Sequence, residues 1–86
     1  MEFKKSLIKR NVAGDNILVP VGKTILNTSG LFVLNEVGAF IWDLIPTVDT
    51  EAQILEAVLQ EFDVTPEEAE KDIADFLAEL RQMEIL

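Results

Sequence analysis

The 86-residue chain contains no histidine, no cysteine and no tyrosine. Histidine is the commonest general base and cysteine the strongest thiol nucleophile, so their absence argues against an enzyme. Zinc and iron sites usually draw on the same two residues, so neither metal is expected and no cofactor is predicted. Without cysteine there is no disulfide framework, which favours a cytoplasmic protein.

Long apolar runs are also missing. No stretch approaches the roughly 20 apolar residues of a membrane span, and no signal-peptide core follows the basic start MEFKKSLIKR. These absences predict a soluble chain that does not enter a membrane. The length suits one modest core, so residues 1–86 are interpreted as a single domain.

Cations are scarce and unevenly placed in a chain of net charge −9. Five of the seven lie within residues 1–23, whereas twelve acids and only Lys71 and Arg81 follow from Asp49 onward. A nucleic-acid partner needs cations to displace the counterions of its phosphates, so DNA and RNA are not expected partners of this half. A basic peptide fits its charge better, although an acidic surface often serves solubility alone.

The first part of the chain predicts three short strands. They cover residues 6–12, 17–21 and 31–34, with a turn at residues 13–16. Pro20 suggests that the second strand is an edge or carries a bulge, because proline cannot donate to a ladder. The stretch GKTILNTSG, residues 22–30, is ambiguous: it either prolongs the second strand or forms a loop.

The second part predicts three helices. Asn35 is the expected N-cap of the first, which Pro46 ends after about Ile45. Thr50 opens the second with a capping-box spacing, and Thr65-Pro66 opens the third, which ends near Met83 or Glu84. Strands followed by helices predict an α+β fold with a winged-helix-like arrangement: a three-stranded antiparallel sheet, then three helices.

Two residues of the first helix have mainly structural interpretations. Trp42 lies among aliphatic side chains, which favours a core position over ligand stacking. Gly38 costs about 1 kcal/mol relative to alanine inside a helix, so a close approach by another backbone is expected there.

The third helix has three interpretations. As a DNA-recognition helix it would bring acids to phosphate, and as a purely structural helix its acids would be solvated. As a groove wall it would present one flank to an extended peptide: Asp72, Asp75, Phe76, Glu79 and Met83. A Mg²⁺ site on its carboxylates is a minor alternative, because no phosphate-binding loop accompanies them.

The third strand is the other candidate site. An open sheet edge presents unpaired N–H and C=O groups that can accept an added strand, here along Leu31, Phe32, Val33 and Leu34. Alternatively the strand is central, is covered, or pairs with a second copy of the chain.

Three motifs carry a family resemblance. LNEVGAFIWDLI (residues 34–45), EFDVT (61–65) and DIADFLAELRQMEIL (72–86) resemble the PqqD-like family, also called RiPP recognition elements, over residues 7–86. This resemblance implies a non-catalytic adaptor that takes the leader of a ribosomally made precursor peptide as a fourth strand. The leader would lie beside residues 31–34 and against residues 72–83.

The resemblance also implies partners. Members deliver the precursor to a modifying enzyme, commonly of the radical-SAM type. The chain departs from the pattern in its longer GKTILNTSG stretch, which implies a relative from another pathway than that of PQQ, and in Glu84, where many members have glycine. A winged-helix DNA-binding module and a homodimerising structural domain are the competing hypotheses, and monomer and homodimer both stay open.

Overall fold

A computed structural model describes residues 1–22 and 32–86 of the chain. Its sheet consists of β1 (Leu7–Val12), β2 (Asp15–Pro20) and β3 (Phe32–Leu34). The helices follow as α1 (Glu36–Leu44), the 3-10 turn η2 (Ile45–Thr47), α2 (Glu51–Glu61) and α3 (Pro66–Gln82). The predicted α+β fold, with antiparallel strands first and helices last, is confirmed. Leu31 and the ambiguous stretch after Gly22 lie outside the described residues.

The β1–β2 hairpin is closed by a two-residue turn, narrower than the predicted four residues. Val12 pairs with Asp15, so Ala13 and Gly14 alone reverse the chain. Both have positive φ, 53° and 89°, as a type I′ turn requires. Glycine adopts this conformation freely, whereas alanine is strained in it.

The sheet order is β1-β2-β3, so β2 is the central strand. The interpretation of the second strand as an edge on the evidence of Pro20 is therefore wrong. Proline is tolerated there because the described part of β3 pairs only with residues 16–18 of β2, while Pro20 lies beyond it and faces Leu7 of β1.

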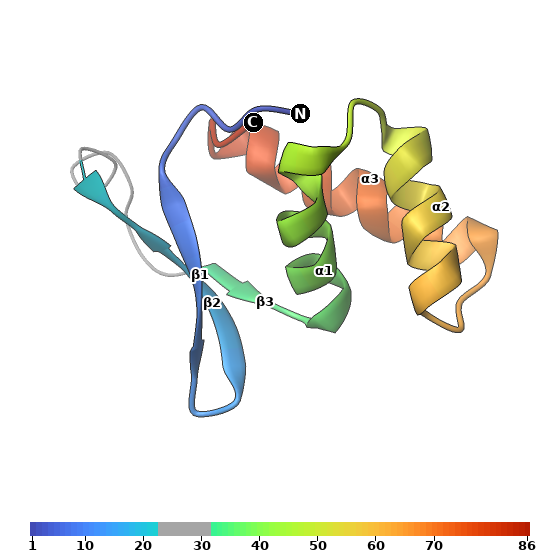
Figure 1. The fold of residues 1–86 in the computed structure, drawn as a ribbon, viewed down its shortest axis with the longest axis horizontal. Helices are drawn as coiled ribbons and strands as arrows, with labels where there is room; N and C mark the ends of the chain where they lie inside the picture. The colour runs from blue at the N-terminus through green and yellow to red at the C-terminus, as the bar shows by residue number, and fades with distance from the viewer. Residues whose placement is uncertain (23–31) are drawn as a thin grey trace.

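The two faces of the sheet have different environments. Leu18 and Leu34 point inward and are buried, whereas Val33, between two inward-pointing residues of β3, is 64% exposed. In Figure 1 the sheet lies to one side of the helices, and α3 passes behind α1 and α2. The buried core joins the inner face of the sheet to all three helices.

Side-chain caps begin each helix where the sequence predicts one. Asn35 accepts a hydrogen bond from the Gly38 amide at 2.7 Å and starts α1. Thr50 and Gln53 form a reciprocal capping box at α2. Thr65 accepts from the Glu68 amide at 3.2 Å, with proline following as the first helical residue of α3.

The end of α3 forms a Schellman motif. The Ile85 amide donates to the Leu80 carbonyl at 2.8 Å, and the Glu84 amide donates to the Arg81 carbonyl at 3.0 Å. Glu84 has φ = 60°, the left-handed conformation that glycine adopts most easily. Glu84, where many members of the resembling family have glycine, therefore stands at a position whose backbone conformation favours glycine.

The N-terminal segment lies along α1 and the end of α3. Phe3 stacks on buried Trp42 with ring centroids 4.2 Å apart, and the Lys4 amide donates to the Ile85 carbonyl at 2.7 Å. Lys5 Nζ donates to the carbonyl of Met83 at 2.8 Å. Figure 1 accordingly shows the two ends of the chain close together. Within the described ranges, no helix has the length and apolarity needed to cross a membrane.

Candidate functional site

One edge of β3 faces away from β2 and pairs with no strand within residues 1–22 and 32–86. Such an edge carries backbone N–H and C=O groups that another extended chain can satisfy. Because β3 leads through Asn35 directly into α1, this edge lies next to the first turn of that helix.

A groove of about 270 Å³ opens between β3 and α3. One side and the floor come from β3, the cap of α1 and the first turns of α1. The residues lining this part are Phe32, Val33, Leu34, Asn35, Val37, Gly38 and Ile41. Most of these side chains are apolar, so the floor can bury apolar groups of an occupant.

The opposite wall comes from one flank of α3, residues Asp72, Asp75, Phe76 and Glu79. The Phe76 ring is tilted against the Phe32 ring, with centroids 6.2 Å apart. This aromatic pair joins the strand to the helix across the groove. The three carboxylates are exposed and stand beside Phe76.

Gly38 forms part of the floor. A Cβ there would lie 3.2 Å from Asn35 Oδ1 and 3.6 Å from both Leu34 Cδ2 and Phe76 Cε1. The close approach expected at this glycine therefore exists, but the neighbours are side chains and not another backbone. The space beside Gly38 therefore holds at most one methyl group between Asn35, Leu34 and Phe76.

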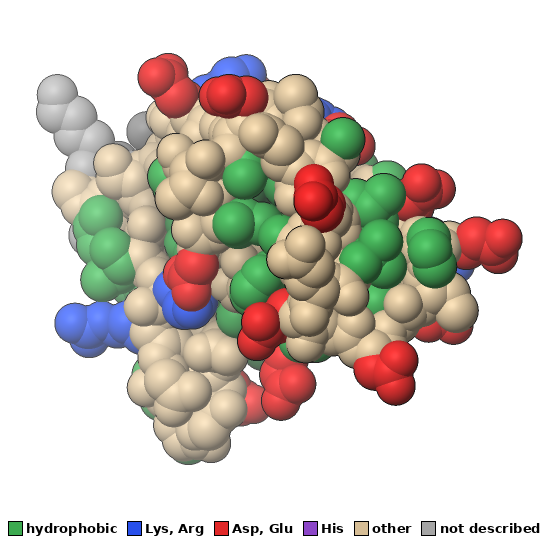
Figure 2. All heavy atoms as spheres, turned by 45° about the vertical axis from the view of Figure 1, so that its right-hand side comes forward, with side chains coloured by type: hydrophobic (Ala, Val, Ile, Leu, Met, Phe, Trp, Pro, Cys, Tyr) green, Lys and Arg blue, Asp and Glu red, His purple; other side chains and the backbone are tan. Residues whose placement is uncertain are grey.

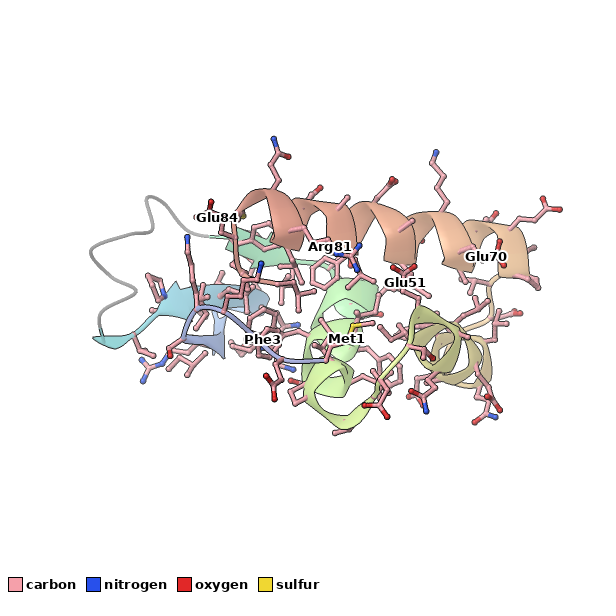
Figure 3. All side chains as sticks on the ribbon, turned by 90° about the horizontal axis from the view of Figure 1, so that it is seen from above. Met1, Phe3, Glu51, Glu70, Arg81 and Glu84 are labelled. Atoms are coloured by element: carbon pink, nitrogen blue, oxygen red, sulfur yellow. The ribbon has the colours of Figure 1, made fainter. Side chains whose placement is uncertain are left out.

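The groove is acidic, and no lysine or arginine is among its described lining residues. The ion pairs that the described residues form lie elsewhere: Lys9 with Asp43, and Arg81 with Glu51 at 3.4 Å. Figure 3 shows the second pair between α3 and α2. Acidic side chains are also spread over the face shown in Figure 2. An occupant with positive charge would therefore meet uncompensated carboxylates in the groove.

A second hollow, of about 370 Å³, lies between α2 and α3. It is lined by Glu51, Ala52, Leu55, Glu70, Ile73 and Ala74. All of these residues belong to α2 and α3, so this hollow offers no strand edge.

The structure brings seven of the nine predicted site residues to one groove: Phe32, Val33, Leu34, Asp72, Asp75, Phe76 and Glu79. Leu31 lies outside the described residues. Met83 is not among the residues that line the groove; it is the C-cap of α3, and its carbonyl accepts a hydrogen bond from Lys5 Nζ. Sequence reasoning did not assign Asn35, Val37, Gly38 and Ile41 to the site. The short connection from strand to helix was the available signal, since it puts the first turns of α1 beside the strand.

The geometry can be compared with known proteins. The family model described as coenzyme PQQ synthesis protein D (PqqD) matches residues 22–86. The chain belongs to the PqqD family. A solved structure described as TbiB1 in complex with the TbiA(beta) leader peptide is similar over 100% of this chain and 94% of that one, with 27% identity and a TM-score of 0.75. No curated protein matches the chain.

Proposed function

We propose that this PqqD-family chain binds the leader of a ribosomally synthesised precursor peptide as an added strand along β3. The observation that carries the proposal is the groove itself, which combines an open strand edge with an apolar floor and a helical wall. The likeness to TbiB1, whose structure was solved with a leader peptide, supports the same assignment.

The two parts of the groove would serve different purposes. Main-chain hydrogen bonds to β3 hold an extended peptide whatever its side chains, and the floor selects among side chains. Each apolar side chain buried on the floor contributes about 1.5–3 kcal/mol before ordering costs. The affinity would come from two or three such side chains together with a short ladder.

The proposed role is that of an adaptor without chemistry of its own. The bound leader would be presented to a modifying enzyme, of the radical-SAM type or another class, which acts on the remainder of the precursor. Since precursor peptides are made on ribosomes, the proposal places this peptide-modification role in the cytoplasm. The chain would act as a peptide chaperone during biosynthesis.

The test uses a 12-residue peptide selected on this protein from a displayed library of random sequences and titrated by calorimetry. A scan that methylates one backbone amide of this peptide at a time should weaken binding at every second residue. This period of two is expected because alternate amides of an added strand face β3. Uniform sensitivity, or none, would contradict strand addition.

The same edge could instead pair with β3 of a second copy. Sedimentation measures this competitor directly: a tight dimer that leader peptide does not dissociate would contradict the adaptor role. A gel-shift series at low salt tests the winged-helix alternative, and salt-sensitive DNA binding would favour it.

A further inference from the structure

The acids of the groove are placed regularly around Phe76. Asp72 and Glu79 both line the groove and are seven residues apart, which on a helix puts them within about 20° of the same line. Phe76 lies between them along the axis, about 6 Å from the level of Asp72 and about 4.5 Å from the level of Glu79. The outer edge of the α3 wall, here called the rim, therefore carries carboxylates on both sides of Phe76 along the axis: Asp72 and Asp75 on one side and Glu79 on the other.

An added strand has a matching period. Side chains on one face of a strand recur every second residue, at about 6.6–6.8 Å. Figures 1 and 3 show β3 running roughly along the axis of α3, so a strand beside β3 would run along the same rim. A groove-facing residue over Phe76 would then have its same-side neighbours near Asp72 and near Glu79.

The floor and the rim of the groove favour different side chains of a bound peptide. The groove is lined by the apolar side chains of Phe32, Leu34 and Phe76, so it favours a bulky apolar group. The rim residues Asp72 and Glu79 are exposed, and the described lining offers them no cation. Lysine and arginine have long apolar stems and a charged end, so they can follow the groove wall and reach these carboxylates.

We propose that the peptide taken by this groove carries a bulky apolar residue with lysine or arginine two residues before it and two residues after it. The inference rests on the proposed strand addition and specifies which peptides the site accepts. Because the pattern is symmetric, it holds whether the peptide runs parallel or antiparallel to β3. A peptide with aspartate or glutamate at the flanking positions is rejected by like charge.

The test is a selection from a displayed library of random 12-residue peptides. Wild-type protein is compared with Asp72→Asn/Asp75→Asn/Glu79→Gln, which removes the groove charges. A control, Glu56→Gln/Glu61→Gln/Glu70→Gln, removes three exposed acids outside the groove and changes the net charge equally. Wild type and control should enrich peptides with lysine or arginine two residues before and two residues after a bulky apolar residue. The groove variant should enrich the apolar residue alone.

A selected peptide then gives the magnitude by fluorescence anisotropy. Replacing both flanking cations by glutamine should weaken its binding to wild type by about 2- to 30-fold, the range for two exposed ion pairs. Glu79→Gln should cancel the effect at one flanking position and Asp72→Asn at the other. The loss should largely vanish at about 1 M salt, where screening is strong.

The outcomes separate this inference from the proposed function. If wild type and the groove variant select the same sequences, or if the glutamine peptide binds equally well, the charge pattern is overturned while strand addition stands. If no peptide is selected, or if selected peptides tolerate methylation of every backbone amide, strand addition itself fails and the pattern falls with it.

Discussion

Substitution of Gly38 acts on stability and on peptide binding through different contacts. Alanine is favoured over glycine by up to about 1 kcal/mol in a helix. Against this gain, the new Cβ would lie 3.2 Å from Asn35 Oδ1, the atom that caps α1 by accepting from the Gly38 amide at 2.7 Å. Since such a cap is also worth about 1 kcal/mol, Gly38→Ala should stay within about 1 kcal/mol of wild type.

Substitutions of Gly38 by larger residues should only weaken peptide binding. Gly38 lines the groove, and the added methyl group would take up the space between Leu34 Cδ2 and Phe76 Cε1, at 3.6 Å from each. Displacing one methylene of the bound peptide costs about 0.8 kcal/mol, or roughly a fourfold loss of affinity. Gly38→Val adds two methyl groups where a Cβ already meets three side chains, so it should displace Leu34 or Phe76 into the groove and weaken binding by more than about tenfold.

The assay pairs urea unfolding with anisotropy titration of a peptide selected on the wild type. Ala78→Val is the matched control, because Ala78 is exposed on α3 and does not line the groove. This control should bind the peptide like wild type. A Gly38→Val variant that unfolds cooperatively and keeps wild-type affinity would refute the assignment of the groove as the binding site.

Three further predictions concern the strand edge and the ends of the chain. Val33→Pro removes one main-chain donor of β3 and should weaken peptide binding while the helical circular dichroism is retained. Val33→Ala shortens a 64% exposed side chain and should bind the peptide nearly normally. Equal affinity of the two variants would contradict binding of the peptide at the edge of β3. Phe3→Ala removes the stack on Trp42 and should lower the free energy of unfolding by about 2 kcal/mol. The fluorescence of this single tryptophan should shift to the red, and an unchanged emission maximum would contradict the stack. Glu84→Gly relieves the strain of a left-handed backbone conformation and should raise the free energy of unfolding, measured in urea, by about 0.5–1 kcal/mol without changing peptide affinity. A loss of stability would show that contacts of the glutamate side chain compensate for this strain.

Local signals in the sequence predicted the helices well. Asn35, Thr50 and Thr65 were each expected to begin a helix, and each accepts the capping hydrogen bond. Caps depend on residues within one turn, so neighbouring sequence is sufficient to recognise them. The acidic flank of α3 was equally visible, because helical spacing alone puts Asp72 and Glu79 on one side.

Features that depend on distant residues were harder to predict. Pro20 suggested an edge strand, but the order of the sheet makes β2 central and the proline harmless. The close approach at Gly38 was expected from its position, yet the contacting atoms belong to Leu34 and Phe76, which only the packing of α1 brings there. Met83 was predicted to face the peptide together with residues 72–79 of α3, but it is not among the residues that line the groove. Each of these differences arises from tertiary arrangement and not from local propensity.

The described part of β3 is only three residues long. An added strand beside so short a segment gains few main-chain hydrogen bonds, each contributing about 0.5–1.5 kcal/mol net. Micromolar affinity requires about 8 kcal/mol, so the larger share must come from side chains on the floor and rim. Differences in affinity between related peptides appear mostly in their dissociation rates. A leader whose side chains fit the floor and rim poorly would therefore have a short residence time on the protein.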